Sequence, residues 1–192
     1  MRTSKAMPYH IGLHVKLYPS NEQKYIIAVN DGAQRSVYNH LVAVGNERFR
    51  LRQAAKYVPA YRNHLQYLQD TASSTAGMKT ALPYLNEADV DSDTVNNAFW
   101  NYRFAWKNMK ENHRGVPTFH KKSAEQSYQT NSHYKSGDTG IFDGSIRFDG
   151  MSHLILPKIG RIRIGASPKL LQELLVHPTA RRITTVTVQR DA

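Results

Sequence analysis

The sequence predicts an α+β fold, in which a helical block is inserted after the first strand of a small β-barrel. Residues 9–18 alternate apolar and polar side chains with the period of a half-buried strand, and a helical period follows. After Gly115 the segments become short, alternating or β-branched, and glycines separate them. Because a lone first strand needs partners, we expect it to pair with strands of the C-terminal half. The predicted domains are therefore a β-barrel from residues 1–19 and 115–192, and a helical domain from residues 20–114.

Ser20 begins the first predicted helix with a capping box. Its hydroxyl accepts from the amide of Gln23, and the Gln23 side chain reaches back to the start of the helix. Apolar residues from Ile26 onward continue a helical stripe to about Arg52. Gly32 is a weak point inside this stripe, where the helix can bend or break.

Shorter segments complete the helical block. A second helix is expected over residues 60–69, and the small polar residues 71–77 are interpreted as a loop. The acidic run 87–93 should stabilise the start of a helix over residues 94–112, because carboxylates favour a helix N-terminus. A metal site is the alternative interpretation of these carboxylates. Gly115 follows the helix and favours its end.

The carboxyl-terminal half contains the other predicted strands. They are expected near residues 126–130, 139–149, 153–156, 160–164 and 183–190. One helix interrupts them, with Ser167 as its N-cap and Pro168 at its first position. Asp138, Asp143 and Asp149 neighbour glycines, so we interpret them as turn residues rather than as metal-binding catalytic acids.

Composition indicates a polyanionic partner. The 192 residues carry a formal net charge of +11 and include 11 tyrosines, and nucleic acid is the commonest polyanion that such a protein binds. The absence of cysteine excludes disulfides and thiolate zinc sites. No apolar run approaches the ~20 residues of a membrane span, and the basic start lacks the apolar stretch of a signal peptide. We therefore expect a cytoplasmic protein with no membrane partner.

Common catalytic motifs are missing from the sequence. It contains no Gly-x-Ser-x-Gly elbow, no Walker loop and no Gly-x-Gly-x-x-Gly fingerprint. The histidines lack metal-ligand spacing. No catalytic residue and no metal ligand is therefore predicted, and no cofactor is expected in this chain.

Residues suited to nucleic acid are more plentiful. Lys121 and Lys122 follow Phe119 on a backbone stiffened by Pro117, which suits a phosphate-gripping corner. Other candidates fall on helix faces and in strand-like sequence. The full set of predicted nucleic-acid-binding residues is Lys16, Gln23, Arg35, Tyr38, Asn39, Arg103, Lys107, Lys121, Lys122, Gln126, Lys158, Arg161 and Arg163.

Spacing supports three groups within this set. Arg35, Tyr38 and Asn39 fall on one helix face, where Arg and Asn suit base edges; the alternative is a solvated face with Tyr38 half in the core. Arg103 and Lys107 begin a basic helical stripe, for which a charged solvent face is the alternative. The third group, Lys158, Arg161 and Arg163, surrounds a glycine and is placed to follow a phosphate backbone.

Several separated motifs agree with one known family. They are Leu17-Tyr18-Pro19-Ser20 with Gln23, Arg35 with Val37-Tyr38-Asn39, Phe99 with Trp106, Gly115-Val116-Pro117-Thr118-Phe119 with Lys121-Lys122, Gln126-Ser127-Tyr128, Leu156-Pro157-Lys158-Ile159-Gly160-Arg161-Ile162 and Val186-Thr187-Val188. In this order they resemble the N-terminal half of the TnpB family, the transposon-encoded RNA-guided DNA nucleases related to type V CRISPR effectors.

The resemblance implies a wedge domain, which is an oligonucleotide-binding-like β-barrel, with an inserted helical recognition domain. It implies guide RNA and target double-stranded DNA as partners, because such proteins recognise duplex shape and backbone while base pairing supplies sequence. Lys121, Lys122, Lys158, Arg161 and Arg163 are then expected to grip RNA backbone. Gln23, Arg35, Tyr38 and Asn39 are expected to face DNA or the guide–target duplex.

The family continues into a RuvC nuclease domain, and this sequence ends at Ala192 without one. We therefore expect the chain alone not to cut, and Mg²⁺ only in the nuclease domain that is absent. Three origins are expected: an excised fragment, a natural split subunit, or a degenerate protein kept for binding. Further possible partners are a separate RuvC nuclease chain or a second copy of this chain. The alternative function is a guide-independent DNA-binding regulator that uses the helical block as a helix-turn-helix.

Overall fold

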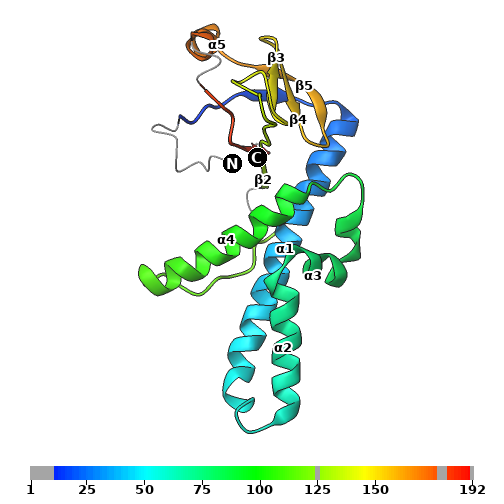
Figure 1. Cartoon of the computed structure of the whole chain (residues 1–192), viewed down its shortest axis with the longest axis vertical. Helices are drawn as coiled ribbons and strands as arrows, with labels where there is room; N and C mark the ends of the chain where they lie inside the picture. The colour runs from blue at the N-terminus through cyan, green and yellow to red at the C-terminus, as the bar shows by residue number, and fades with distance from the viewer. Residues whose placement is uncertain (1–10, 124–125, 177–180, 191–192) are drawn as a thin grey trace. The chain divides into compact units, whose positions relative to one another are not determined.

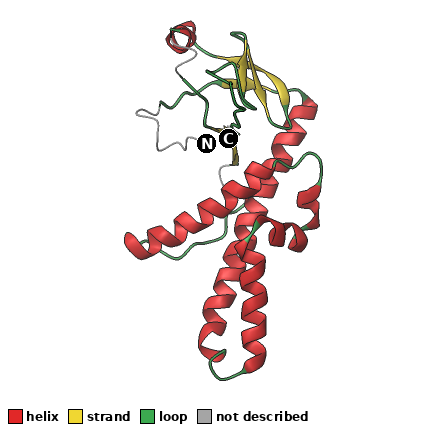
Figure 2. Cartoon of the chain, in the orientation of Figure 1, coloured by secondary structure: helices red, strands yellow, loops and turns green. Residues whose placement is uncertain are grey.

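The computed structural model describes residues 11–123, 126–176 and 181–190 and has a mixed α+β architecture (Figures 1 and 2). Packing divides the chain into two compact units. The first comprises Met1–Ile27 and Thr130–Thr187, and the second comprises Ala28–Gln129 and Val188–Ala192. The functional domain boundaries expected after residues 19 and 114 remain a prediction.

A four-stranded antiparallel sheet dominates the first unit. Its strands are β1 (Lys16–Tyr18), β3 (Arg147–Asp149), β4 (His153–Leu156) and β5 (Gly160–Gly165), in the spatial order β1-β5-β4-β3. The expected pairing of the first strand with the C-terminal half is therefore confirmed.

The first strand is shorter than the predicted range 9–18, of which residues 9 and 10 lie outside the described residues. Lys16 pairs with Gly165, the last residue of β5, and the next helix begins at Pro168. The residues just before Lys16 consequently have no further length of β5 to pair with.

The remaining strands form a separate, open sheet. β2 (Ser127–Asn131) pairs with β6 (Thr185–Gln189), and α5 (Pro168–Leu175) lies between β5 and β6 in sequence. Of the strand predicted over residues 139–149, only β3 is extended. The turns before it use Asp138 and Asp143 as predicted, because their carboxylates accept from the amides of Lys135 and Thr139 at 2.8 Å each.

Helices make up most of the second unit. They are α1 (Asn21–Ala54), which begins in the first unit, α2 (Pro59–Ser73), α3 (Thr75–Ala81), the 3₁₀ helix η2 (Pro83–Asn86) and α4 (Ser92–Glu111). α1 is continuous through Gly32. α2 runs back beside the second half of α1, where His64 and Glu47 are 2.6 Å apart (Figure 1).

The loop predicted over residues 71–77 is wrong. α2 continues to Ser73, and α3 begins at Thr75. Ser74 caps α3, because its hydroxyl accepts from the amide of Gly77 at 3.1 Å. The small polar residues that suggested a loop thus include a helix cap.

The core of the second unit joins α1, α3, η2 and α4. Its fully or nearly buried members are Ala33, Val37, Tyr38, Leu41, Val42, Met78, Leu85, Val90, Val95, Ala98 and Phe99. The acidic run before α4 serves this junction. Asp91 caps α4 by accepting from the amide of Asp93 at 3.1 Å, and its own amide donates to the buried Asn30 at 2.8 Å. The predicted role of this run in stabilising the start of the helix is therefore confirmed for Asp91.

Within the described part of the chain, no helix combines the length and apolarity that a membrane crossing requires. In the same residues, no group of three or more His, Asp or Glu side chains is placed to hold a metal ion.

Candidate nucleic-acid interface

One face of the four-stranded sheet carries the charged side chains of β1, β3, β4 and β5. Directly opposite residues of antiparallel strands share a face, and Arg163 pairs with Tyr18 on one side and with His153 on the other. The opposite face is buried, with Ile162 and Ile164 at 0% and 5% exposure. The basic sheet face consists of Lys16, Tyr18, Arg147, Asp149, His153, Ile155, Arg161 and Arg163.

Tyr18 forms an aromatic platform on this face. Its ring lies over Gly165, where a Cβ atom would come within 2.9 Å of the ring. The side chain is nevertheless 49% exposed. The Lys16 Nζ and Arg163 Cζ atoms lie 5.7 and 5.6 Å from the ring centroid, within the range of cation–π attraction. The ring is therefore held against the sheet and flanked by two cations.

The basic sheet face has a positive excess, because four cations share it with a single carboxylate. Arg161 Nε donates to Asp149 Oδ2 at 2.5 Å. This bond, together with the charges of Arg161, His153 and Arg147, holds the pKa of Asp149 below its ordinary value. Asp149 on β3 thus stays ionised, and it orients the guanidinium of Arg161 on β5 across the intervening strand β4.

Lys158 lies in the turn of the β4–β5 hairpin, not on a strand. Its φ of 64° is in the left-handed region, and Gly160 follows with a φ of 74°. The side chain is exposed. The predicted trio of Lys158, Arg161 and Arg163 is therefore carried by one hairpin, with two members on the basic sheet face and one at its turn.

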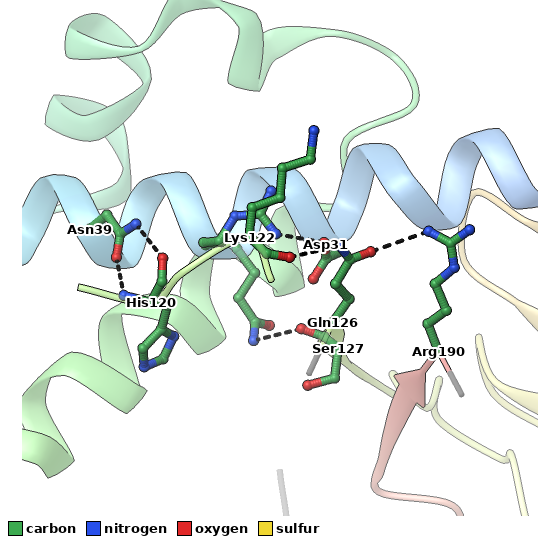
Figure 3. Close-up of polar contacts among 9 residues, drawn as sticks. Asp31, Asn39, His120, Lys122, Gln126, Ser127 and Arg190 are labelled. Carbon is green, nitrogen blue, oxygen red and sulfur yellow. Dashed lines mark hydrogen bonds and ion pairs between the residues drawn. The ribbon is translucent and has the colours of Figure 1, made fainter. Parts of the chain in front are cut away.

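In the second unit, Asn39 holds the segment Gly115–Lys122 against α1. Its side-chain amide donates to the backbone carbonyl of His120 at 3.0 Å, and its Oδ1 accepts from the His120 amide at 2.8 Å (Figure 3). Pro117 is buried, whereas Lys121 and Lys122 are exposed. Asn39 was predicted to face nucleic acid, but the structure uses both ends of its amide to fix the basic segment.

Tyr38 belongs to the core, with an exposure of 6%, which favours the alternative weighed from the sequence. The His120 ring stacks on it, with centroids 4.0 Å apart and planes 15° apart. Burial raises the pKa of the Tyr38 hydroxyl. A nucleic-acid base has no access to this ring face, because His120 already occupies it.

Arg35 lies beside this stack and is paired within α1. Its Nη1 donates to Asp31 Oδ2 at 2.9 Å (Figure 3). Partial burial, followed by the charge of Arg35, lowers the pKa of His120. Arg35, Tyr38 and Asn39 thus follow one another on α1. Tyr38 and Asn39 contact His120 of the basic segment, whereas Arg35 pairs with Asp31.

Gln126 connects the end of the basic segment to β6. Its Nε2 donates to the Lys122 carbonyl at 3.0 Å, and its Oε1 accepts from Arg190 at 3.3 Å (Figure 3). The Arg190 amide also donates to the Gln126 carbonyl at 3.0 Å. Gln126 therefore links the backbone of Lys122 to Arg190, the residue that follows β6.

Arg103 and Lys107 are exposed on α4, as the basic stripe predicts. The Arg103 guanidinium lies 5.3 Å from the centre of the Trp100 ring. Lys107 Nζ lies 3.7 Å from Glu111 Oε2, a solvent-exposed pair. These two cations lie on a different unit from the basic sheet face.

Gln23 has a structural role that accounts for its whole side chain. The capping box is confirmed, since Ser20 Oγ accepts from the Gln23 amide at 3.2 Å and Gln23 Oε1 accepts from the Ser20 amide at 3.0 Å. Its Nε2 donates to the carbonyls of Ile159 and Arg161 at 3.3 and 2.8 Å. Gln23 is expected from the sequence to face DNA, but both polar atoms of its side chain are already hydrogen-bonded within the protein.

Sequence reasoning did not select Tyr18, Arg147 or His153 as binding residues. The alternation within residues 9–18 contained a usable signal, because Tyr18 and Lys16 point to the polar side of that strand. Arg147 and His153 carried no comparable signal, since only the register of β3 and β4 brings them to the same face. No protein-family model matches the sequence, and no curated protein matches it.

Proposed function

We propose that this protein binds nucleic acid, with the basic sheet face as its principal RNA-binding surface. The observation that carries the proposal is Tyr18, exposed beside the cations Lys16 and Arg163 on one side of an open sheet. Aromatic rings on a sheet accept stacked bases, and surrounding cations accept phosphates. The net charge of +11 supports the same class of partner.

The resemblance to TnpB proteins refines this proposal. The chain would act as the guide-RNA and target-DNA binding part of an RNA-guided nuclease. Its sheets would belong to a wedge-like, oligonucleotide-binding-like barrel, and the helices after residue 19 would be an inserted recognition domain. Cutting and its metal ions are not part of the proposal.

The segment Gly115–Lys122 has a supporting role in this reading. Asn39 fixes its backbone, so Lys121 and Lys122 are presented on an ordered segment that is already held on α1. Ordering a binding segment in advance lowers the entropic cost of contacting a partner. We assign these two lysines to phosphate contacts made by the second unit.

The test compares two double variants in their binding to a structured RNA. Lys16→Gln with Arg163→Gln removes two cations from the basic sheet face. Arg50→Gln with Lys56→Gln removes two exposed cations from elsewhere in the chain. We expect about a 10- to 100-fold loss of affinity for the first pair and little change for the second. Equal losses would attribute binding to net charge and contradict the assignment to the sheet.

Two glycine substitutions test the contribution of the Tyr18 ring to RNA binding separately from the contribution of charge. Gly165→Ala places a Cβ atom within 2.9 Å of the Tyr18 ring and should displace it, whereas Gly12→Ala meets no atom within 4 Å. RNA affinity should fall for Gly165→Ala alone.

The alternative function, a helix-turn-helix regulator, predicts a different result for the wild-type protein. After RNase treatment it would select one DNA duplex and would not bind RNA.

A further inference from the structure

α4 exposes two large aromatic side chains on the same side of the helix. Trp100 and Phe104 are 54% and 55% exposed and are four residues apart, with ring centroids 6.3 Å apart. The core residues Ala98 and Phe99 of the same helix are 0% and 6% exposed. The exposed rings thus lie outside the packed side of α4, and core packing does not account for them.

Cations accompany these rings. Arg103 lies over the Trp100 ring at 5.3 Å, and Lys107 lies one turn further along. Beside them is an open groove of about 320 Å³, lined by Tyr102, Arg103, Trp106, Lys107, Lys110 and Glu111. Three cations and one carboxylate line the groove, so its charge is positive. Trp100, Arg103, Phe104 and Lys107, together with this groove, are called the α4 aromatic–basic surface.

We propose that the α4 aromatic–basic surface binds unpaired RNA nucleotides, a second site separate from the basic sheet face. Bases would stack on Trp100 and Phe104, and the neighbouring phosphates would contact Arg103 and Lys107. A base-paired helix keeps its base faces stacked internally, so only loops, bulges and single strands offer them to protein rings. This inference rests on the proposed RNA-binding function and specifies which RNA elements the second unit takes.

Charge argues against a second copy of this chain as the occupant. Two copies of the surface would bring Arg103, Lys107 and Lys110 toward their own counterparts, and like charges placed opposite each other disfavour association. An RNA strand supplies the complementary charge together with flat apolar rings. The guanidinium over Trp100 fits this partner, since arginine stacks on bases and pairs with phosphate.

The first experiment separates unpaired from paired RNA. The probes are a ten-nucleotide oligouridine and a blunt 16-base-pair RNA duplex, and the protein is the 192-residue chain carrying Trp100→Ala with Phe104→Ala. The matched control is Phe49→Ala, an aromatic on α1 that is 75% exposed. The double variant should lose oligouridine affinity about 5- to 150-fold per ring removed, at unchanged duplex affinity, while the control binds both probes as wild type does.

A fluorescence measurement reports the contact directly. The sequence contains two tryptophans, Trp100 and Trp106, so Trp106→Phe leaves Trp100 as the only reporter. Oligouridine should quench the emission of Trp106→Phe at saturation more strongly than that of Trp100→Phe, because Trp106 lines the groove but is not one of the proposed stacking rings. The second variant keeps an aromatic ring at position 100, so its binding should weaken less than that of the alanine variant.

The outcomes distinguish this inference from the proposed function. Oligouridine binding with no quenching of Trp100 and no effect of the double alanine variant overturns the α4 site and leaves the sheet-face proposal standing. Failure of wild-type protein to bind either RNA overturns both proposals. Equal quenching by a ten-nucleotide oligothymidine DNA overturns the restriction to RNA. A dimer in sedimentation that the double alanine variant abolishes would assign the surface to a second copy instead.

Discussion

Asn39 fixes a basic segment through two hydrogen bonds to one backbone unit, that of His120. Removing them by Asn39→Ala should lower the free energy of unfolding by about 1–2 kcal/mol, because each net hydrogen bond contributes about 0.5–1.5 kcal/mol. Urea denaturation measures this change. Hydrogen exchange in residues 116–122 should accelerate more than in the α1–α2 region. Asn63→Ala, at an exposed position of α2, is the matched control and should be nearly neutral.

His120 makes the stability of the same segment depend on pH. Its pKa is lowered by partial burial and by Arg35, and the pKa of His40 is lowered by burial. Below about pH 6.5 the unfolded chain therefore binds more protons than the folded chain, so the free energy of unfolding falls as pH is lowered through this region. His120→Gln should reduce the loss of stability between pH 7.5 and 5.5, measured by urea denaturation. An unchanged pH dependence in this variant would contradict the assignment.

At the scale of elements, Gln23 connects the first turn of α1 to the β4–β5 hairpin. Gln23→Ala removes three side-chain hydrogen bonds, one to Ser20 and two to the carbonyls of Ile159 and Arg161. We expect a loss of about 1–2 kcal/mol in the free energy of unfolding, seen in thermal or chemical denaturation.

The variant Gln23→Glu separates the two contributions. Glutamate keeps an oxygen that accepts from the Ser20 amide, but it places a second oxygen against two carbonyl oxygens. Its stability should therefore stay close to that of Gln23→Ala. Recovery to the wild-type value would show that the helix cap alone matters, and Lys24→Gln on the exposed side of α1 is the neutral control.

Elements were predictable where a local signal decides them. The capping box at Ser20, the acidic start of α4 and the alternation of β5 each follow from neighbouring residues, and the structure contains all three. Residues 71–77 misled because Ser and Gly are common both in loops and at helix caps. Only the register of pairing with β5 and the point at which β5 ends limit β1 to Lys16–Tyr18.

Site residues were predictable in type but less so in role. Arg35, Tyr38 and Asn39 share a helix face, and spacing alone shows that much. Whether that face meets solvent, core or another segment depends on contacts with His120, which is 81 residues from Asn39 in sequence. Long-range packing therefore makes Tyr38 and Asn39 supports for the basic segment, while Arg35 pairs with Asp31 on its own helix.

At the scale of the whole molecule, cationic surfaces occur on both compact units. The first unit carries the basic sheet face, and the second carries Lys121, Lys122 and the cations of α4. If one RNA contacts both units, their cations together neutralise more of its phosphates than the cations of either surface would alone. Affinity would then be shared between surfaces, and loss of one would weaken binding without abolishing it.

The salt dependence of binding measures this sharing. Phosphate contacts release counterions, so the logarithm of affinity should fall linearly with the logarithm of salt concentration, by roughly 0.7–0.9 per contact. Lys16→Gln with Arg163→Gln should reduce the slope by about 1.4–1.8, the sum for two contacts. Trp100→Ala with Phe104→Ala should lower affinity at constant slope, since stacking releases no counterions. Titrations of a structured RNA with single-stranded loops at 50–200 mM salt test both. A slope near zero in wild-type protein would refute phosphate-driven binding, and an equal reduction by Arg50→Gln with Lys56→Gln would refute its location on the sheet.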